Sequence, residues 1–350
     1  MFCSVIGGQR VFVENKKILV FGGTGSLGQA LIRRLARQNS LVMFSRDEAK
    51  HWTLRNQYIQ DFNLSFIVGD VRDKDRVKQA IKQSRPDIII HAAALKQVET
   101  CELSPDESIK TNVLGVQNVV ESVLALEASV ANLEKMLLVS TDKACAPTNV
   151  YGMCKAISER IVTSASKLSN KTSFIGVRYG NVLESRGSII PLFRFQGELG
   201  KNITLTHNQM TRFIMTLDES ISLIEATINS ANSGEIWLPK LKSMKIKDLA
   251  EIFAERYKCE IVETGIRPGE KIHEQLISEP ESLRTIEEKN YFRMGPAFEE
   301  TKSVGKSFAY SSQEKNLQKA DLKEYLQRLN IFETDLKNFV GKTIEEIRTN

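Results

Sequence analysis

The feature that most constrains the fold is a glycine-rich segment, Gly22-Gly23-Thr24-Gly25-Ser26-Leu27-Gly28, which follows a short apolar run. The run Lys17–Phe21 predicts a strand, and from Ser26 onward apolar residues recur at helical spacing. Strand, glycine turn and helix in this order are typical of a dinucleotide-binding unit, in which glycines let a pyrophosphate approach the helix N-terminus. A tight turn without a ligand is the alternative interpretation.

Short apolar runs alternate with longer helical stretches over the first half of the chain. This alternation predicts an α/β fold with a Rossmann-like, doubly wound parallel sheet. Beyond about Gly180 the pattern becomes irregular, which predicts a smaller C-terminal substrate-binding lid. The predicted divisions are an N-terminal extension (1–16), a dinucleotide-binding domain (17–180, with 216–238 returning to it), a substrate-binding region (181–215 and 239–300) and a C-terminal helical tail (301–350).

Composition and charge exclude several classes of partner. Lys and Arg number 48 and Asp and Glu 43, so the net charge of +5 is too diffuse for nucleic-acid binding but suits an anionic small molecule. The five cysteines have neither disulfide-framework nor metal-ligand spacing, which predicts a reducing compartment and no metal site. No apolar run approaches the ~18 to 20 residues of a membrane helix. We therefore expect a cytoplasmic protein that binds neither nucleic acid nor membrane.

Two residues at the end of the second predicted strand bear on the choice of dinucleotide. Ser45 and Arg46 lie where the adenosine ribose of a dinucleotide is read, and an arginine beside a hydroxyl suits a 2′-phosphate. This pairing favours NADP over NAD. Asp47 leaves the choice open, since its carboxylate is able to accept a ribose hydroxyl or to cap the next helix.

A tyrosine and a lysine four residues apart, Tyr151 and Lys155, share one face of a predicted helix after the fifth strand. Oxidation of an alcohol needs a base for the hydroxyl proton, and a tyrosine of pKa ~10 is a poor base at neutral pH unless a cation stabilises the phenolate. The pair therefore predicts alcohol oxidation, and a surface pair is the alternative interpretation.

The segment Ser140-Thr141-Asp142-Lys143 ends the fifth predicted strand, at the sheet edge where open α/β folds bind their ligands. Asp142 is able to act as an acid, and Lys143 as a base where burial lowers its pKa. An acid and a base beside a hydride-transfer site permit elimination of water after oxidation. A salt-bridged turn at the surface is the alternative interpretation.

These segments resemble the NADP-dependent UDP-N-acetylglucosamine 4,6-dehydratases (5-inverting), a family within the extended short-chain dehydrogenase/reductase superfamily. The resemblance runs from about Lys17 to about Ser278. Lys143 is the discriminating residue, because retaining nucleotide-sugar dehydratases carry an acidic residue at that position. The motifs that carry the resemblance are GGTGSLG, FSRDE from Phe44, HAAALKQVE from His91, STDKA from Ser140, PTNVYGMCK from Pro147, RYGNVLESRGS from Arg178 and RPGEKIHE from Arg267.

The resemblance implies a reaction and a role for each residue near the fifth strand. Tyr151 would assist loss of the 4-hydroxyl proton while hydride passes to NADP, and Lys155 would hold the nicotinamide ribose and lower the tyrosine pKa. Lys143 would abstract the proton on carbon 5, and Asp142 would protonate the departing 6-hydroxyl. Thr141 would hydrogen-bond the 4-oxygen. Reprotonation from the opposite face would invert carbon 5, and the hydride would return to carbon 6.

The resemblance also implies two sets of binding residues and a homo-oligomeric assembly. The cofactor set is Gly22, Thr24, Gly25, Ser26, Leu27, Gly28, Ser45, Arg46, Asp70, Val71, Ala92, Ala93, Lys96, Tyr151 and Lys155. The UDP-N-acetylglucosamine set is Lys96, Thr141, Asn181, Arg212, Arg267 and Glu270. Arginine suits bidentate contact with a diphosphate, but each arginine is equally able to form a salt bridge within the lid. His91 is as consistent with a core histidine as with a cofactor contact.

Two other functions remain open at this stage. A UDP-sugar 4-epimerase would use Tyr151 and Lys155 but leave Asp142 and Lys143 without a chemical task. A non-catalytic NADP-binding regulatory protein would need none of these four side chains for chemistry.

Overall fold

The structure is a computed structural model of the 350-residue chain and describes residues 5–6, 9–10, 13–58, 63–130, 132–183, 188–299 and 306–332. The chain divides into two compact units. Half of the predicted N-terminal extension (residues 1–4, 7–8 and 11–12) and residues 301–305 and 333–350 of the predicted helical tail lie outside the described residues. Unit 1 comprises Met1–Tyr179, Asp218–Lys240 and Ile277–Ala309, and unit 2 comprises Gly180–Leu217, Leu241–Leu276 and Tyr310–Asn350.

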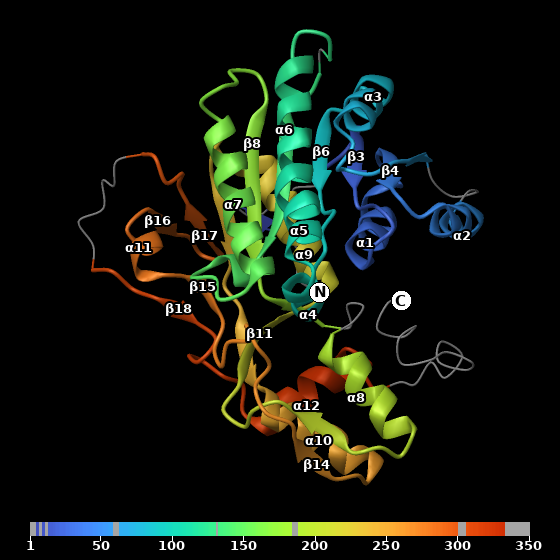
Figure 1. The fold of residues 1–350 in the computed structure, drawn as a ribbon. Helices are drawn as coiled ribbons and strands as arrows, with labels where there is room; N and C mark the ends of the chain where they lie inside the picture. The colour runs from blue at the N-terminus through green and yellow to red at the C-terminus, as the bar shows by residue number, and fades with distance from the viewer. Residues whose placement is uncertain are drawn as a thin grey trace. The chain divides into compact units, whose positions relative to one another are not determined.

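Unit 1 is built on a twisted sheet that is parallel over most of its width (Figure 1). Its nine strands among the described residues are, in spatial order, β16 (Thr285–Glu287), β17 (Tyr291–Met294), β12 (Ile236–Pro239), β8 (Ser173–Tyr179), β7 (Lys135–Thr141), β6 (Ile88–His91), β3 (Lys17–Phe21), β4 (Ser40–Ser45) and β5 (Leu64–Val68). The strands from β12 to β5 pair in parallel, and β17 and β16 extend the β12 edge antiparallel. Strand order reverses between β3 and β6, the position at which open α/β sheets bind ligands.

Helices cover both faces of this sheet, as predicted for a doubly wound fold (Figure 1). The helices α3 (Lys74–Ser84), α6 (Gly115–Leu126) and α7 (Val150–Ala165) pack side by side against one buried cluster that includes Val119 and Phe174. Helix α1 (Ser26–Leu35) connects β3 to β4, on the other side of the point where strand order reverses, and the right-handed crossover rule puts such a helix on the other face. The sequence pattern therefore predicted the fold class correctly.

The last part of the predicted substrate-binding region belongs to unit 1, which corrects one predicted division. We predicted residues 239–300 as substrate-binding region, but the structure places Ile277–Ala309 in unit 1. There β17 pairs with β12, and β16 pairs with β17. Strands of three or four residues are too short for a hydrophobic period to reveal their partner, so the sequence did not identify this edge.

Unit 2 has a hydrophobic core of its own. The strands β9 (Asn181–Val182), β11 (Thr211–Met215) and β13 (Lys242–Lys245) form a small sheet, and β10 (Ile203–Leu205) pairs with β14 (Ile261–Glu263). The helices α8 (Ile189–Glu198), α10 (Ile246–Tyr257) and α12 (Lys319–Arg328) pack around a cluster that includes Phe193, Phe253 and Leu322. The helix α12 of the predicted tail is therefore part of this core.

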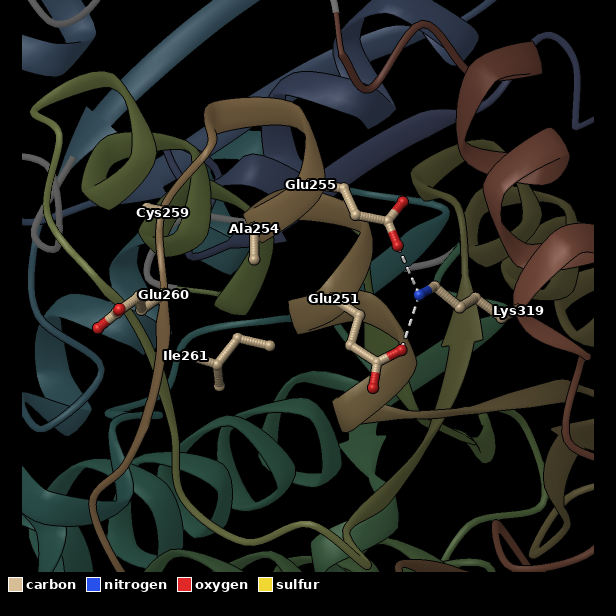
Figure 2. Close-up of a pocket in the computed structure, with 7 residues that line it drawn as sticks. All are labelled: Glu251, Ala254, Glu255, Cys259, Glu260, Ile261 and Lys319. Carbon is tan, nitrogen blue, oxygen red and sulfur yellow. Dashed lines mark hydrogen bonds and ion pairs between the residues drawn. The ribbon is translucent and has the colours of Figure 1, made fainter.

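A surface cavity of about 600 Å³ lies in unit 2 between α10, β14 and α12 (Figure 2). The ammonium of Lys319 bridges Glu251 and Glu255 there, at 2.7 Å from each carboxylate. None of the predicted site residues lines this cavity. Among the described residues, no helix combines the length and apolarity needed to cross a membrane, and no His, Cys, Asp and Glu side chains form a metal-binding group.

Candidate active site

The glycine turn after β3 packs so closely that three of its four glycines, Gly22, Gly23 and Gly28, have no room for a side chain. Gly22 has a φ of +84°, and a β-carbon there would lie 2.6 Å from the amide nitrogen of Ala93. A β-carbon at Gly28 would lie 2.0 Å from the carbonyl oxygen of Gly23. Gly25, directly before α1, is different, since the nearest atom to its β-carbon position is 3.5 Å away. The helix N-terminus is thus open at Gly25, which fits the pyrophosphate of a dinucleotide.

Neighbouring strand ends bring further predicted cofactor residues to the glycine turn. The amide of Gly22 donates to the carbonyl of Phe44, and the amide of Ala92 donates to the carbonyl of Phe21, each at 2.9 Å. The structure therefore brings Ala92 and Ala93 against the turn, at the edge where strand order reverses. His91 is a fully buried core residue that packs on Phe21, and burial lowers its pKa to about 3.

The predicted ribose-reading residues meet at the end of β4. The Ser45 hydroxyl accepts a hydrogen bond from Thr24 (3.2 Å) and lies 2.8 Å from Nε2 of His51. The guanidinium of Arg46 lies 3.8 Å from the carboxylate of Asp70. His51 was missed at the sequence level, because α2 (Glu48–Tyr58) is largely polar and offers no apolar stripe from which to read its buried face.

Val71 and Lys96 have different surroundings. The Val71 side chain belongs to the hydrophobic core of unit 1, so only its backbone is left for a cofactor contact. Lys96 is exposed in the loop after β6. Asn112 fixes the neighbouring residue of that loop, because its side chain both donates to the carbonyl and accepts from the amide of Leu95, each at 2.8 Å. Asn112 lies in the segment Lys-Thr-Asn-Val-Leu-Gly at residues 110–115, and we assigned it no role from the sequence.

The end of β7 brings the predicted acid and base together. Thr141 Oγ1 donates to Oδ1 of Asp142 at 3.0 Å, and Nζ of Lys143 donates to the same oxygen at 3.1 Å. The Asp142 side chain is buried, whereas the Lys143 side chain is 19% exposed. A salt bridge therefore exists, but it is not the surface pair that we considered as the alternative. The Lys143 side chain is partly exposed to solvent, whereas the Asp142 carboxylate is buried.

The first turn of α7 packs against the backbone of Lys143. Asn149 caps the helix by accepting from the amide of Gly152 at 2.8 Å, and a β-carbon at Gly152 would lie 2.3 Å from the carbonyl oxygen of Lys143. Burial raises the pKa of Tyr151 to about 12, against the opposing effects of the Lys143 charge and a hydrogen bond with Thr141. Tyr151 is therefore a phenol at neutral pH in this structure.

Lys155 lies one turn further along α7 and differs from our expectation. Its Nζ donates to the carbonyl of Val139 at 2.6 Å. Burial lowers its pKa to about 8, with the charge of Glu159 opposing that shift. We expected Lys155 to lower the pKa of Tyr151, but the cation that does so here is Lys143. The i, i+4 spacing sets a shared face, whereas the hydrogen bond to β7 sets where the ammonium points.

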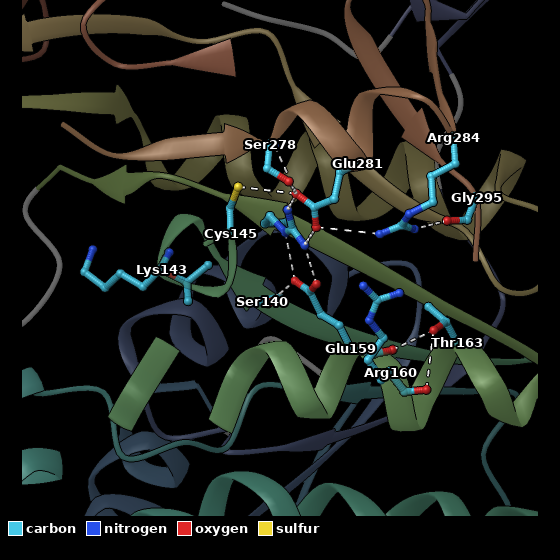
Figure 3. Close-up of polar contacts among 12 residues, drawn as sticks. Ser140, Lys143, Cys145, Glu159, Arg160, Thr163, Ser278, Glu281, Arg284 and Gly295 are labelled. Carbon is cyan, nitrogen blue, oxygen red and sulfur yellow. Dashed lines mark hydrogen bonds and ion pairs between the residues drawn. The ribbon is translucent and has the colours of Figure 1, made fainter. Parts of the chain in front are cut away.

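A buried ionic network supports this arrangement, and the sequence analysis missed it. Arg178 on β8 is 1% exposed and donates to Glu159 of α7 and to Glu281 of α11 (Glu279–Ser282). Glu159 also accepts from Ser140 at 2.6 Å, and Glu281 accepts from the Cys145 thiol at 3.3 Å. Glu159 and Glu281 lie on opposite sides of the network (Figure 3). One guanidinium thus links the strand before Thr141, the helix of Tyr151 and the loop after Lys143.

The predicted substrate residues of unit 2 form local contacts. Arg212 on β11 donates to the carbonyls of Thr211 (2.7 Å) and Ile272 (3.1 Å). Asn181 on β9 pairs in register with Ile214 on the neighbouring parallel strand β11. The structure brings Arg267 and Glu270 together, with 3.9 Å between guanidinium and carboxylate. Arg267 therefore forms a salt bridge, which is the alternative interpretation that we gave for the arginines.

The chain is similar to known proteins over most of its length. Residues 18–296 match the family described as polysaccharide biosynthesis protein. The chain is 36% identical over 338 residues to a UDP-N-acetylglucosamine 4,6-dehydratase (inverting) of Campylobacter jejuni subsp. jejuni serotype O:2, which covers 91% of this chain and 98% of that protein. It is 40% identical over 332 residues to an uncharacterized membrane protein of Methanocaldococcus jannaschii, covering 91% and 97% of the two chains.

Two further comparisons bear on function and fold. A UDP-glucose 4-epimerase of Rickettsia bellii is 35% identical over 352 residues, covering 94% of this chain and all of that protein. The X-ray structure of Pen from Bacillus thuringiensis superimposes with a TM-score of 0.82 at 32% identity, covering 91% of this chain and 98% of that one.

The fold defines the class: a Rossmann-type α/β protein with a parallel sheet and a close-packed glycine turn after its first strand. The chain belongs to the polysaccharide biosynthesis protein family. Its resemblance to the inverting UDP-N-acetylglucosamine 4,6-dehydratases is confirmed over most of its length.

Proposed function

We propose that this protein is a UDP-N-acetylglucosamine 4,6-dehydratase that inverts carbon 5 and uses NADP. The observation that carries the proposal is the Asp142–Lys143 pair, whose Nζ–Oδ1 distance is 3.1 Å, directly beside the helix of Tyr151. An acid and a base at one sheet edge are what elimination of water requires after a neighbouring alcohol is oxidised. The 36% identity to a protein named for this reaction supports the same choice.

Each side chain of the cluster has one task in this reaction. The deprotonated form of Tyr151 receives the proton of the 4-hydroxyl, and Thr141, which shares a hydrogen bond with Tyr151, orients the 4-oxygen. A bound nicotinamide dinucleotide would supply the hydride acceptor for carbon 4 and the hydride donor for carbon 6. A proton moves from the Lys143 ammonium to the Asp142 carboxylate across their 3.1 Å hydrogen bond, which leaves a neutral amine and a carboxylic acid. The 4-keto group acidifies the hydrogen on carbon 5, the Lys143 amine removes that proton, and Asp142 supplies its proton to the 6-hydroxyl, which leaves as water.

The product is UDP-2-acetamido-2,6-dideoxy-L-arabino-hexos-4-ulose, formed when carbon 5 is reprotonated on the opposite face. No net oxidation occurs, since the hydride that leaves carbon 4 arrives at carbon 6. Lys155 holds the cofactor ribose, and Arg46 with Ser45 binds the 2′-phosphate of NADP. On the substrate side, Lys96, Asn181, Arg212, Arg267 and Glu270 contact the UDP moiety.

We further propose that the protein works in the cytoplasm as a homo-oligomer. The described residues hold no candidate membrane helix, which is consistent with a soluble enzyme. Apolar side chains are exposed on α4 (Val98–Leu103) and α7, where Leu103 is 79%, Met153 48% and Ile157 50% exposed. Exposed apolar side chains of this size favour burial against another surface.

The test is incubation of the purified protein with UDP-N-acetylglucosamine in deuterated water without added reductant, followed by mass spectrometry and NMR. We expect loss of one water, deuterium at carbon 5 and an inverted carbon 5. The same dehydration with carbon 5 retained would remove the inverting role of Lys143.

A UDP-sugar 4-epimerase is the second candidate, because the Rickettsia relative carries that name at 35% identity. It would yield the galacto isomer without loss of water in the same experiment. A non-catalytic NADP-binding protein would leave the sugar nucleotide unchanged.

A further inference from the structure

Three polar side chains form a chain of hydrogen bonds behind the end of β4. Thr24 Oγ1 donates to Oγ of Ser45 at 3.2 Å, and Oγ of Ser45 lies 2.8 Å from Nε2 of His51. His51 comes from α2, is 4% exposed, and packs its ring against Phe66 at a centroid distance of 5.1 Å. Its other nitrogen, Nδ1, is buried and has no hydrogen-bond partner among the described residues.

This environment selects one tautomer of the imidazole. Burial lowers the pKa of His51, so the ring is neutral at pH 7 and carries a single N–H. With the proton on Nδ1, a buried N–H donor would lack an acceptor, which is among the rarest situations in folded proteins. With the proton on Nε2, the N–H is donated to Ser45 and Nδ1 presents only a lone pair. The Nε2–H tautomer is therefore the stable one.

The tautomer determines what the Ser45 hydroxyl offers to a ligand. A serine oxygen has two acceptor positions and one proton. Thr24 and His51 both donate to Ser45, so its two lone pairs are used and only its proton remains for a further partner. A hydroxyl that can only donate suits a phosphate oxygen. Such a hydroxyl cannot accept a hydrogen bond from a ribose hydroxyl that donates.

We propose that His51 is a specificity-determining residue that makes the protein select the 2′-phosphate of NADP, by fixing Ser45 as a hydrogen-bond donor. The inference deepens the proposed function, since it rests on a dinucleotide binding at this strand end. Arg46 supplies the positive charge. Its side chain is 57% exposed, and Asp70 is held more closely by Arg72 (2.7 Å) than by Arg46 (3.8 Å).

The experiment measures the affinity of the full-length protein for adenosine 2′,5′-bisphosphate and for adenosine 5′-monophosphate by calorimetry. The ratio of the two affinities reports recognition of the 2′-phosphate alone, without turnover. His51→Phe keeps an aromatic ring against Phe66 but removes the N–H. We expect this variant to lose about tenfold in the ratio, the size of one hydrogen bond to a charged group.

The matched control is His51→Gln, whose amide nitrogen replaces Nε2 as a donor and is expected to keep most of the ratio. Ser45→Ala is expected to lose as much as His51→Phe, and the double variant is expected to lose no more than either. Ser45→Ala also keeps the proposal testable where the buried His51→Phe change prevents folding.

Different failures have different meanings. An unchanged ratio in a folded His51→Phe protein, or full additivity in the double variant, overturns the role of His51. A wild-type protein that binds both nucleotides equally overturns the choice of NADP, and with it this inference. A wild-type protein that binds neither overturns the proposed dinucleotide site itself.

Discussion

Gly152 lies against the backbone of Lys143, so that a β-carbon at position 152 would sit 2.3 Å from the Lys143 carbonyl oxygen. Alanine would favour the helix by about 1 kcal/mol, but forcing this contact apart costs about 1–3 kcal/mol. The difference between these two effects is a loss of up to about 2 kcal/mol, and we expect Gly152→Ala to lower the free energy of unfolding by that amount and to reduce turnover further, because the Lys143 loop has to move. Urea unfolding and sugar-nucleotide turnover check both effects.

The matched control for this change is Gly295→Ala. The nearest atom to a β-carbon at Gly295 is 3.5 Å away, which is ordinary contact. Equal losses of stability in the two variants would contradict a special role for the Gly152 contact.

Removing the Lys143 amine tests the proposed base. We expect Lys143→Ala to lower the rate of water loss by about 10²–10⁴-fold, the usual contribution of a general base, while bound cofactor is retained. Mass spectrometry follows the water loss, and assay of nucleotide released on denaturation follows the cofactor. Lys110→Ala is the control, since Lys110 is an exposed residue paired with Asp106 and Glu107. Full turnover by Lys143→Ala would remove this residue from the mechanism.

Glu281 predicts a stability difference that depends on pH. Burial alone would raise the pKa of Glu281, but the charge and hydrogen bonds of Arg178 lower it from 4.5 to about 2. A depressed carboxyl pKa stabilises the fold above pH 4.5, and this stabilisation is lost as the pH falls toward 2. We expect Glu281→Gln to cost about 3 kcal/mol at pH 7, from about 1.4 kcal/mol per pKa unit, and much less at pH 3.

Denaturant unfolding at the two pH values measures that difference. Glu287→Gln serves as the control, because Glu287 pairs with Lys240 at 2.7 Å but its side chain is 67% exposed. A surface pair of this kind contributes about 0–1 kcal/mol. A Glu281→Gln effect that stays constant from pH 7 to pH 3 would argue against the depressed pKa.

Lys155 predicts that cofactor affinity depends on pH. Burial lowers the pKa of this ammonium from 10.5 to about 8, so the unliganded protein loses the charge as pH rises through that value. We expect NADP affinity to be flat below this pH and to fall by up to about tenfold per pH unit above it. Calorimetric titration of NADP binding between pH 6.5 and 9.5 tests this expectation. The Lys155→Arg variant stays charged over this range, so its NADP affinity is expected not to fall above pH 8.

The sequence predicted those parts of the fold and site that depend on nearby residues. Gly22 to Gly28 and Thr141 to Lys155 are short segments in which spacing, strand ends and helix faces determine placement. The Arg178 network was missed because Glu281 is 103 residues from Arg178, and no local pattern connects two residues so far apart. The direction of the Lys155 ammonium was missed for a related reason, because a hydrogen bond to β7 decides it.

The return of Ile277–Ala309 to unit 1 also has a consequence for the order of synthesis. Strand β12 is translated long before β17, its antiparallel neighbour, and Arg178 is translated 103 residues before Glu281. During translation a nascent chain therefore holds an open sheet edge and a guanidinium with one carboxylate partner until the residues up to Met294 have left the ribosome. Asp142, Lys143 and Tyr151 are translated well before Glu281, so the buried network beside them is completed only after they have been made.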